Sequence, residues 1–234
     1  MNDQLKLLYE KYWDSFITNV YKATMKEGKP ICAYPFLIQA TKHYINASKR
    51  VMICGQETQV WGIEFHNPDL TNQSDLLQLY NKFVNKNHEE GLREKPGYNS
   101  PYWNFQWKII SASPEIGFVT QNLVKVGKYA SAGCDNTIYE LTKKYFPVWK
   151  DELKILKPDC ILFLTGPHYD QRIREIVGEF KTMAIDGTDG FLDELIFNDP
   201  TMPKAYRTYH PRFLQSKKKY FHIAQKISDI VNNL

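Results

Sequence analysis

Four short polar motifs in this chain each follow an apolar run, and their side chains are suited to acid, base or hydrogen-bond chemistry. They are Gly55-Gln56-Glu57-Thr58, Thr120-Gln121-Asn122, Thr165-Gly166-Pro167-His168 and Tyr209-His210-Pro211-Arg212. In open parallel sheets, ligands bind beyond the carboxyl ends of the strands. A carboxylate, a carboxamide and a histidine are therefore expected at one edge of a sheet. For any single motif, the alternative is that strand ends are polar only because loops are wet.

The apolar runs before these motifs have the length and composition of buried strands, and helical patterns separate them. Strands are predicted over residues 50–55, 115–120, 159–166 and 204–209. Helices are predicted over residues 5–20, 35–48, 75–84, 100–111, 147–157, 170–177 and 216–231. This alternation favours an α/β fold, a three-layer α/β/α sandwich with a central mostly parallel sheet. No repeat or linker interrupts it, so we expect one domain over residues 1–234.

Composition narrows the class of protein further. The chain has 234 residues, of which 43% are hydrophobic, and a formal net charge of +4. This argues against disorder, and the charge alone does not imply a nucleic-acid partner. The cysteines, at 32, 54, 134 and 160, lack the close spacing of a zinc or iron–sulfur site, so no cofactor is expected. No apolar stretch has membrane length, and we expect a cytoplasmic protein without membrane contact.

With these motifs in this order, the chain resembles the uracil-DNA glycosylase superfamily. Gly55-Gln56-Glu57 resembles the family's first motif, His210-Pro211 its second, and Asn122 its base-reading asparagine. Glu57, Thr58 and Arg212 stand where the family usually has aspartate, proline and serine. The resemblance implies a uracil-DNA glycosylase-like fold over residues 51–214. It also implies an enzyme that hydrolyses the N-glycosidic bond of uracil or another damaged base flipped out of DNA.

Two of these residues would be catalytic in such an enzyme. The transition state separates charge, with a cationic sugar and an anionic base. Glu57 would stabilise the cation or orient water, and His210 would donate a hydrogen bond to the departing base. The alternatives are a helix cap or loop salt bridge for Glu57 and a structural role for His210.

Three further residues would bind the base. The Asn122 carboxamide would donate to O4 of uracil and accept from N3–H, a pattern that cytosine reverses. Gln56 would contribute backbone N–H groups, and Trp61 would stack on the flipped base. The alternatives are that Asn122 caps a helix and that Trp61 belongs to the core.

A basic segment around His210 would contact single-stranded DNA or a damaged duplex. It comprises Arg207, Arg212, Lys217, Lys218 and Lys219. Such residues bind phosphates, although a solvated helix turn has the same composition. Leu214 or Phe213 would wedge into the base stack, or would pack the last helix.

Two other functions remain open at this point. One is a catalytically weak nucleic-acid or nucleobase-binding module on the same fold, and the other is a small-molecule enzyme on a flavodoxin-like sheet. In every case we expect a monomer.

Overall fold

The computed structural model describes residues 1–58, 61–62, 71–86, 88, 99–129, 131, 133 and 135–234. They form two compact units, each assembled from three chain segments. The first unit comprises Met1–Gln39, Gln56–Phe83 and Asn122–Leu156, and the second comprises Ala40–Gly55, Val84–Gln121 and Lys157–Leu234. The single domain over residues 1–234 stays a prediction. Among the described residues, no helix has the length and apolar character needed to cross a bilayer.

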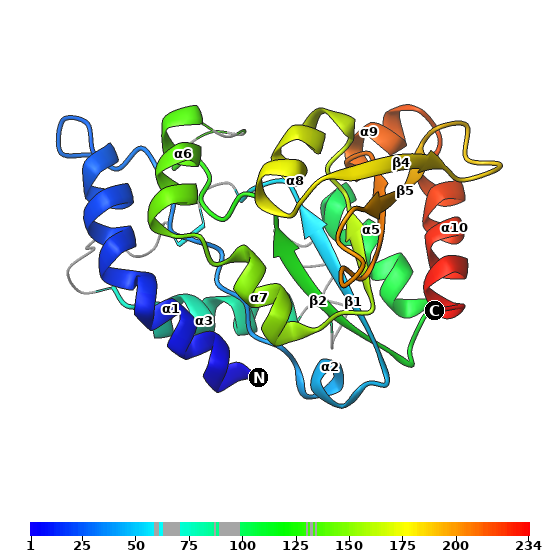
Figure 1. The fold of residues 1–234 in the computed structure, drawn as a ribbon, viewed down its shortest axis with the longest axis horizontal. Coiled ribbons are helices and arrows are strands. Elements are labelled where there is room, and N and C mark those ends of the chain that lie inside the picture. Colours follow the sequence, from blue (N-terminus) through cyan, green and yellow to red (C-terminus); the bar gives the residue numbers. More distant parts are fainter. Residues whose placement is uncertain are drawn as a thin grey trace. The chain divides into compact units, whose positions relative to one another are not determined.

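A six-stranded sheet organises the second unit, in the order β2-β1-β3-β6-β5-β4 (Figure 1). Its strands are β1 (Lys49–Gly55), β2 (Ile116–Asn122), β3 (Cys160–Phe163), β4 (Phe180–Ala184), β5 (Leu192–Phe197) and β6 (Lys204–Thr208). β1 pairs with β3, and β3 with β6, in parallel, and the arrows of β1 and β2 point the same way in Figure 1. Only the β6–β5–β4 side is antiparallel. The four predicted strands are confirmed, and the fold is mixed α/β with a mostly parallel sheet.

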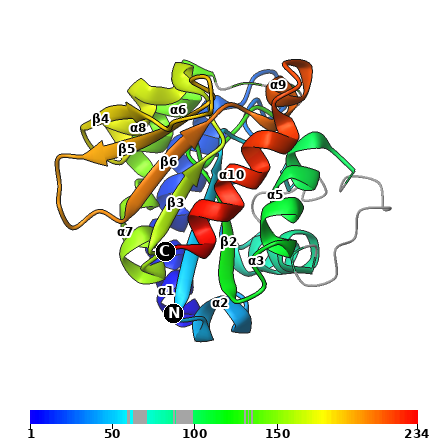
Figure 2. The ribbon, with the colours of Figure 1, turned by 90° about the vertical axis from the view of Figure 1, so that its right-hand side faces the viewer.

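The core of the second unit explains why these apolar runs became strands. Ile53 and Leu162 are fully buried on the face that packs on helices α5 (Pro101–Ser111) and α10 (Tyr220–Asn232). Figure 2 shows α10 lying across the strands. Met52 and Ile161, which alternate with these residues, are also fully buried. Burial of both faces is the pattern expected for the middle layer of a three-layer fold.

The antiparallel edge of the sheet was absent from the sequence prediction. Four of the five residues in β4 are exposed, so its sequence has no inward-facing apolar run. It is held by antiparallel pairing with β5, in which Phe180 lies opposite Phe197 and Ala184 opposite Asp193. Before it along the chain comes α8 (Asp170–Ile176), which confirms the predicted short helix there. The closing segment divides into α9 (Pro211–Ser216) and α10, with Lys218 in a left-handed turn between them.

The first unit is helical, with an aromatic core. Its α-helices are α1 (Asn2–Phe16), α3 (Gln73–Tyr80), α6 (Asn136–Tyr145) and α7 (Trp149–Leu156). Phe16 contacts Phe146 edge to face, and Tyr21 stacks on Tyr34 with ring centroids 4.8 Å apart.

The predicted helix over residues 35–48 is wrong for most of its length. Only α2 (Lys42–Asn46), in the second unit, is helical. Residues 33–38 have no regular structure, because their backbone is used in long-range hydrogen bonds. Phe36 N–H donates to the carbonyl oxygen of Lys125 at 2.8 Å, and Ile38 N–H donates to the Tyr9 hydroxyl at 3.0 Å.

Candidate functional site

In the first unit, the motif after β1 lies alongside the segment that follows β2. Val124 N–H donates to the carbonyl oxygen of Gln56 at 2.9 Å. At Gly127 a side chain would not fit, since a Cβ there would lie 1.9 Å from the carbonyl oxygen of Thr58. Gln56 and Glu57 are half-buried. The backbone of the first motif therefore lies beside the residues that follow Asn122, and the convergence of the two motifs' side chains stays a prediction.

A buried ion pair fixes the segment after Asn122. Lys125 Nζ lies 2.7 Å from Glu152 Oε1, and the two side chains are only 3% and 0% exposed. The Tyr9 hydroxyl donates to the same carboxylate oxygen at 2.7 Å and accepts from Ile38 N–H. Burial, followed by the Glu152 charge, raises the pKa of Tyr9 well above its usual value, so the hydroxyl keeps its proton. Sequence reasoning missed this cluster, although a lysine within the apolar run Leu123-Val124-Lys125-Val126 could have signalled it.

In the second unit, the motif after β3 meets the motif after β6. Gly166 N–H donates to the carbonyl oxygen of Thr208 at 2.9 Å. Gly166 has a positive φ of 76°, and a Cβ there would lie 3.0 Å from His168 Nδ1, so glycine suits this close approach. Each of these two hydrogen bonds, Gln56–Val124 and Gly166–Thr208, thus joins segments of a single unit.

His210 has a fixed ring orientation and a lowered pKa. Its Nδ1 accepts from Arg212 N–H at 3.2 Å, which caps α9, and its ring stacks on Tyr102 with centroids 5.7 Å apart and an interplanar angle of 11°. Burial lowers its pKa, and the charges of Arg212 and His168 lower it further. A neutral imidazole whose Nδ1 accepts carries its proton on Nε2. His210 therefore offers an Nε2–H donor. The stacking partner Tyr102 was not identified from the sequence, because one aromatic residue in the aromatic-rich α5 is not distinctive.

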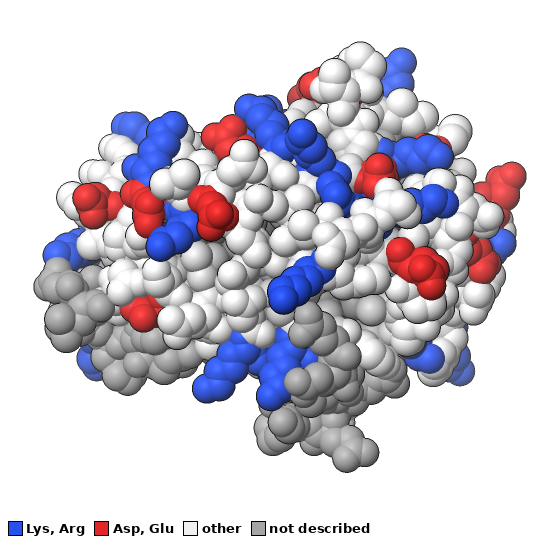
Figure 3. All heavy atoms as spheres, turned by 90° about the horizontal axis from the view of Figure 1, so that it is seen from below, with Lys and Arg blue, Asp and Glu red and all other residues white. Residues whose placement is uncertain are grey.

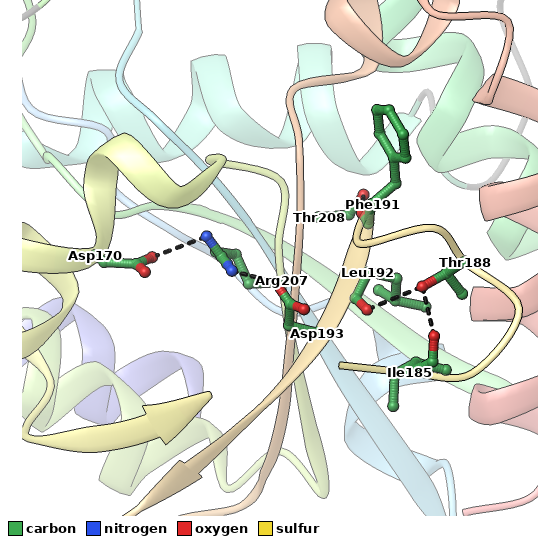
Figure 4. A network of polar contacts seen from close by, with 8 residues as sticks. All are labelled: Asp170, Ile185, Thr188, Phe191, Leu192, Asp193, Arg207 and Thr208. Atoms are coloured by element: carbon green, nitrogen blue, oxygen red, sulfur yellow. Dashed lines mark hydrogen bonds and ion pairs between the residues drawn. The ribbon is translucent and has the colours of Figure 1, made fainter. Parts of the chain in front are cut away.

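Arg207, which the sequence analysis placed among the phosphate-binding residues, is buried in an ion cluster instead (Figure 4). Its guanidinium pairs with Asp193 and lies 3.4 Å from an oxygen of Asp170. Burial raises the pKa of Asp170, and the Arg207 charge opposes that rise. Thr208 extends the network, because its hydroxyl donates to the carbonyl oxygen of Phe191 at 2.7 Å. The predicted phosphate contact of Arg207 is therefore wrong. Its side chain links β6 to β5 and α8 through the two carboxylates.

Two apolar residues proposed to contact DNA or base belong to the core. Leu214 is 0% exposed and packs in the main core of the second unit, so it cannot wedge into a base stack without leaving that core. Trp61 is buried edge to face against Phe36 and Phe83, which matches the packing alternative. Phe213, by contrast, is 40% exposed and remains available as a wedge.

The exposed basic residues after His210 are Arg212, Lys217 and Lys218. Lys219 is partly neutralised, since its Nζ lies 2.5 Å from Asp189 Oδ2. On the face drawn in Figure 3, basic and acidic side chains are interspersed. Arg212, Lys217 and Lys218 are therefore the basic residues of this segment that are exposed enough to meet phosphates.

The predicted common pocket of Glu57, Asn122 and His210 draws on both units. Glu57 and Asn122 belong to the first unit and His210 to the second, so the shared pocket stays a prediction. Among the described residues, no group of three His, Cys, Asp or Glu side chains is arranged to hold a metal ion. Cys134 lies outside the described residues, and Cys32, Cys54 and Cys160 are buried thiols that form no disulfide with one another.

No protein-family model matches the chain, and no curated protein has a detectably similar sequence. The residues and their geometry within each unit are therefore the basis for a functional proposal.

Proposed function

We propose that the protein is a DNA glycosylase of the uracil-DNA glycosylase superfamily, which hydrolyses the N-glycosidic bond of uracil or another damaged base flipped out of DNA. Two hydrogen bonds between strand-end segments carry this proposal. The Gln56–Val124 hydrogen bond sets the carboxylate-bearing segment beside the amide-bearing one, and the Gly166–Thr208 hydrogen bond sets two histidine-bearing segments together.

The state of His210 supports its proposed role. Cleavage of the glycosidic bond leaves negative charge on the base, and a fixed hydrogen-bond donor stabilises that charge as it develops. His210 has a lowered pKa, a stacked ring and an Nε2–H donor. A neutral donor suits this task, since it keeps its own proton while the base departs as an anion.

Glu57 and Asn122 would act on the other parts of the nucleotide. The Glu57 carboxylate would stabilise the cationic sugar or orient the attacking water, and the buried Asn122 carboxamide would read the base edge. Water supplies the hydroxyl group to the sugar carbon, and the base leaves with the electron pair of the broken bond.

Single-turnover excision of uracil from single-stranded DNA tests the proposal. Glu57→Gln keeps the side-chain shape but removes the charge, and should slow excision about a hundred- to a thousandfold while DNA binding persists. His210→Ala should also slow excision, and Asn122→Asp should weaken selectivity for uracil. Glu10→Gln, at an exposed position on α1, is the matched control and should leave the rate unchanged. Excision that survives Glu57→Gln would contradict its assigned role.

The base panel extends to hypoxanthine, xanthine and mismatched bases. Wild-type excision no faster than buffer across the whole panel would overturn the glycosylase. If DNA still bound, the catalytically weak binding module would replace it.

DNA binding itself is tested by its salt dependence. Each phosphate contact that releases a counterion contributes about 0.9 to the slope of log affinity against log salt. Changing Lys217 and Lys218 to Gln should lower that slope, whereas the same change at the exposed Lys6 and Lys11 of α1 should not. Equal slopes for the two double variants would contradict a DNA contact at this segment.

A further inference from the structure

The strand β4 is an edge of the sheet in the second unit. In the described part of the chain it has a strand neighbour on one side only, and α10 crosses the middle of the sheet and leaves β4 to one side (Figure 2). Of its five residues, only Phe180 is buried. An edge strand carries backbone N–H and C=O groups that its own sheet does not use, so it is a template for a strand of another chain.

The pairing with β5 determines which backbone groups of β4 face outward. Just beyond the two ends of β4, Ile185 N–H donates to the carbonyl oxygen of Leu192 at 3.1 Å, and Asn198 N–H donates to that of Glu179 at 2.9 Å. Hydrogen bonding to one neighbour alternates along an antiparallel strand, so the odd-numbered residues of β4 bond to β5. The residues whose N–H and C=O groups point away from β5 are Phe180, Thr182 and Ala184.

Four side chains share one face of the β4–β5 pair. In the register of the two strands, Lys181 lies opposite Ile196, and Met183 lies opposite Glu194. Met183 is 49% exposed and Ile196 is 47% exposed, although both side chains are large and apolar. The face therefore carries one cation, one anion and two exposed apolar side chains. Such a surface can be complementary to itself about a two-fold axis.

We propose that β4 pairs with β4 of a second copy of this chain, antiparallel and about a two-fold axis centred on Thr182. In this register Thr182 lies opposite Thr182 of the second copy, and Phe180 lies opposite its Ala184. Each such pair exchanges two backbone hydrogen bonds, so all the outward-facing groups of β4 are used. The interface is independent of the glycosylase proposal. It replaces the monomer expected from the sequence, in which β4 had not been recognised.

The side chains on the exposed face favour this register. It sets Met183 of each copy between Glu194 of the same copy and Lys181 of the other, so opposite charges flank an apolar side chain. A lysine can lay its methylene stem along that apolar surface while its ammonium group meets the carboxylate. A register centred on Lys181 would instead put two lysines directly opposite each other, which is destabilising. A register centred on Met183 would put both Glu194 carboxylates in one row, without Lys181 between them.

Sedimentation equilibrium of charge-exchanged variants tests the pairing, and the wild type should form a concentration-dependent dimer. Lys181→Glu puts carboxylates on both sides of Met183, and Glu194→Lys puts ammonium groups there, so each variant alone should dimerise about tenfold more weakly. An equimolar mixture of the two variants has opposite charges in both rows and should dimerise within about threefold of the wild type. A wild type that stays monomeric to about 1 mM, or a mixture that dimerises no better than its components, would overturn the proposal.

A proline at Thr182 tests the backbone hydrogen bonds. Because this N–H points away from β5, Thr182→Pro removes no ladder hydrogen bond within the chain but removes two between the copies, so dimerisation should weaken about tenfold or more. Thr182→Val keeps the N–H and the strand preference, and as the matched control it should dimerise within about twofold of the wild type. A dimer that survives Thr182→Pro would lie on another surface and reject this interface. If Thr182→Pro does not fold, the charge-exchanged variants decide alone.

Discussion

Each unit buries an ionic cluster beside one of the polar motifs, and the two clusters are balanced differently. In the first unit Lys125, three residues after Asn122, meets one carboxylate and a tyrosine hydroxyl. In the second unit Arg207, three residues before His210, lies between two carboxylates. Lys125 and Glu152 are almost completely inaccessible, whereas Asp170 and Asp193 are 18% and 13% exposed.

This contrast indicates how strongly each motif depends on the ionic cluster beside it. A fully buried pair has no water to replace a missing partner, so its members depend on each other strongly. A cluster that reaches solvent, with one cation and two anions, can hydrate a carboxylate that loses its partner. We therefore expect the segment after Asn122 to be fixed rigidly and the strand before His210 to tolerate more change.

The largest expected effect is at Lys125. Lys125→Met strands the Glu152 carboxylate in the core and should lower the free energy of unfolding by about 3–5 kcal/mol. Urea unfolding measures the loss, and amide hydrogen exchange should locate it in α1 and α7. Adding Glu152→Gln to this variant should restore much of the stability. Lys150→Met, at an exposed position on α7, is the control and should change stability by less than about 0.5 kcal/mol.

Arg207→Met tests the partly exposed ionic cluster of the second unit. The two carboxylates lose their cation but can move toward water, so we expect a loss of about 2–3 kcal/mol, below the range for breaking a fully buried pair. Urea unfolding of Arg212→Met, which alters an exposed arginine nearby, provides the reference. A loss at Arg207 equal to that at Lys125 would erase the contrast between the units.

Acid should weaken the second unit through His88. Its pKa is lowered from 6.5 to about 4 in the folded state, so between these values the unfolded chain takes up a proton that the folded chain does not. Stability falls as pH drops through this window, by about 2–3 kcal/mol between pH 7 and 4.5 from this group alone. His88→Gln removes the dependence. Unfolding curves of both proteins at the two pH values should differ accordingly, and parallel pH profiles would refute the assignment.

The smallest expected effect is the difference in stability between variants of the two carboxylates that pair with Arg207. Burial raises the pKa of Asp170 above 3.8, so its charged form is already disfavoured in the folded state. Asp170→Asn should change stability by no more than about 1 kcal/mol at pH 7, and Asp193→Asn should cost about 1–2 kcal/mol. The wild type should lose stability relative to Asp170→Asn as the pH rises from 3.8 through the raised folded pKa. Thermal unfolding over this pH range checks the sign.

The strands that carry the motifs could be predicted because each is a short apolar run stopped by a polar turn. β1, β3 and β6 are buried on both faces, so each appears in the sequence as a continuous apolar run that predicts a strand. The unstructured segment before α2 could not be predicted. Its apolar residues fit a helix, but Phe36 finds a distant backbone partner, which no local pattern encodes.

The candidate site could be predicted only in outline. Residue type and position identified His210, and its neutral state follows from Tyr102, Arg212 and His168, which meet only in the folded unit. The misassignments share a cause. Arg207 and Leu214 are close to His210 in sequence, but a strand and a helix direct their side chains inward, so proximity along the chain overstated their access to DNA.

The interleaving of the two units has a consequence for synthesis on the ribosome. The chain passes from one unit to the other five times, after residues 39, 55, 83, 121 and 156. Every segment of the first unit has been translated once Leu156 is added, but the second unit then still lacks β3 and β6. Until those strands emerge, β1 has no parallel neighbour on that side, and its apolar edge is open to other chains. A nascent chain paused after Leu156 therefore exposes an unpaired strand edge, a feature that favours aggregation.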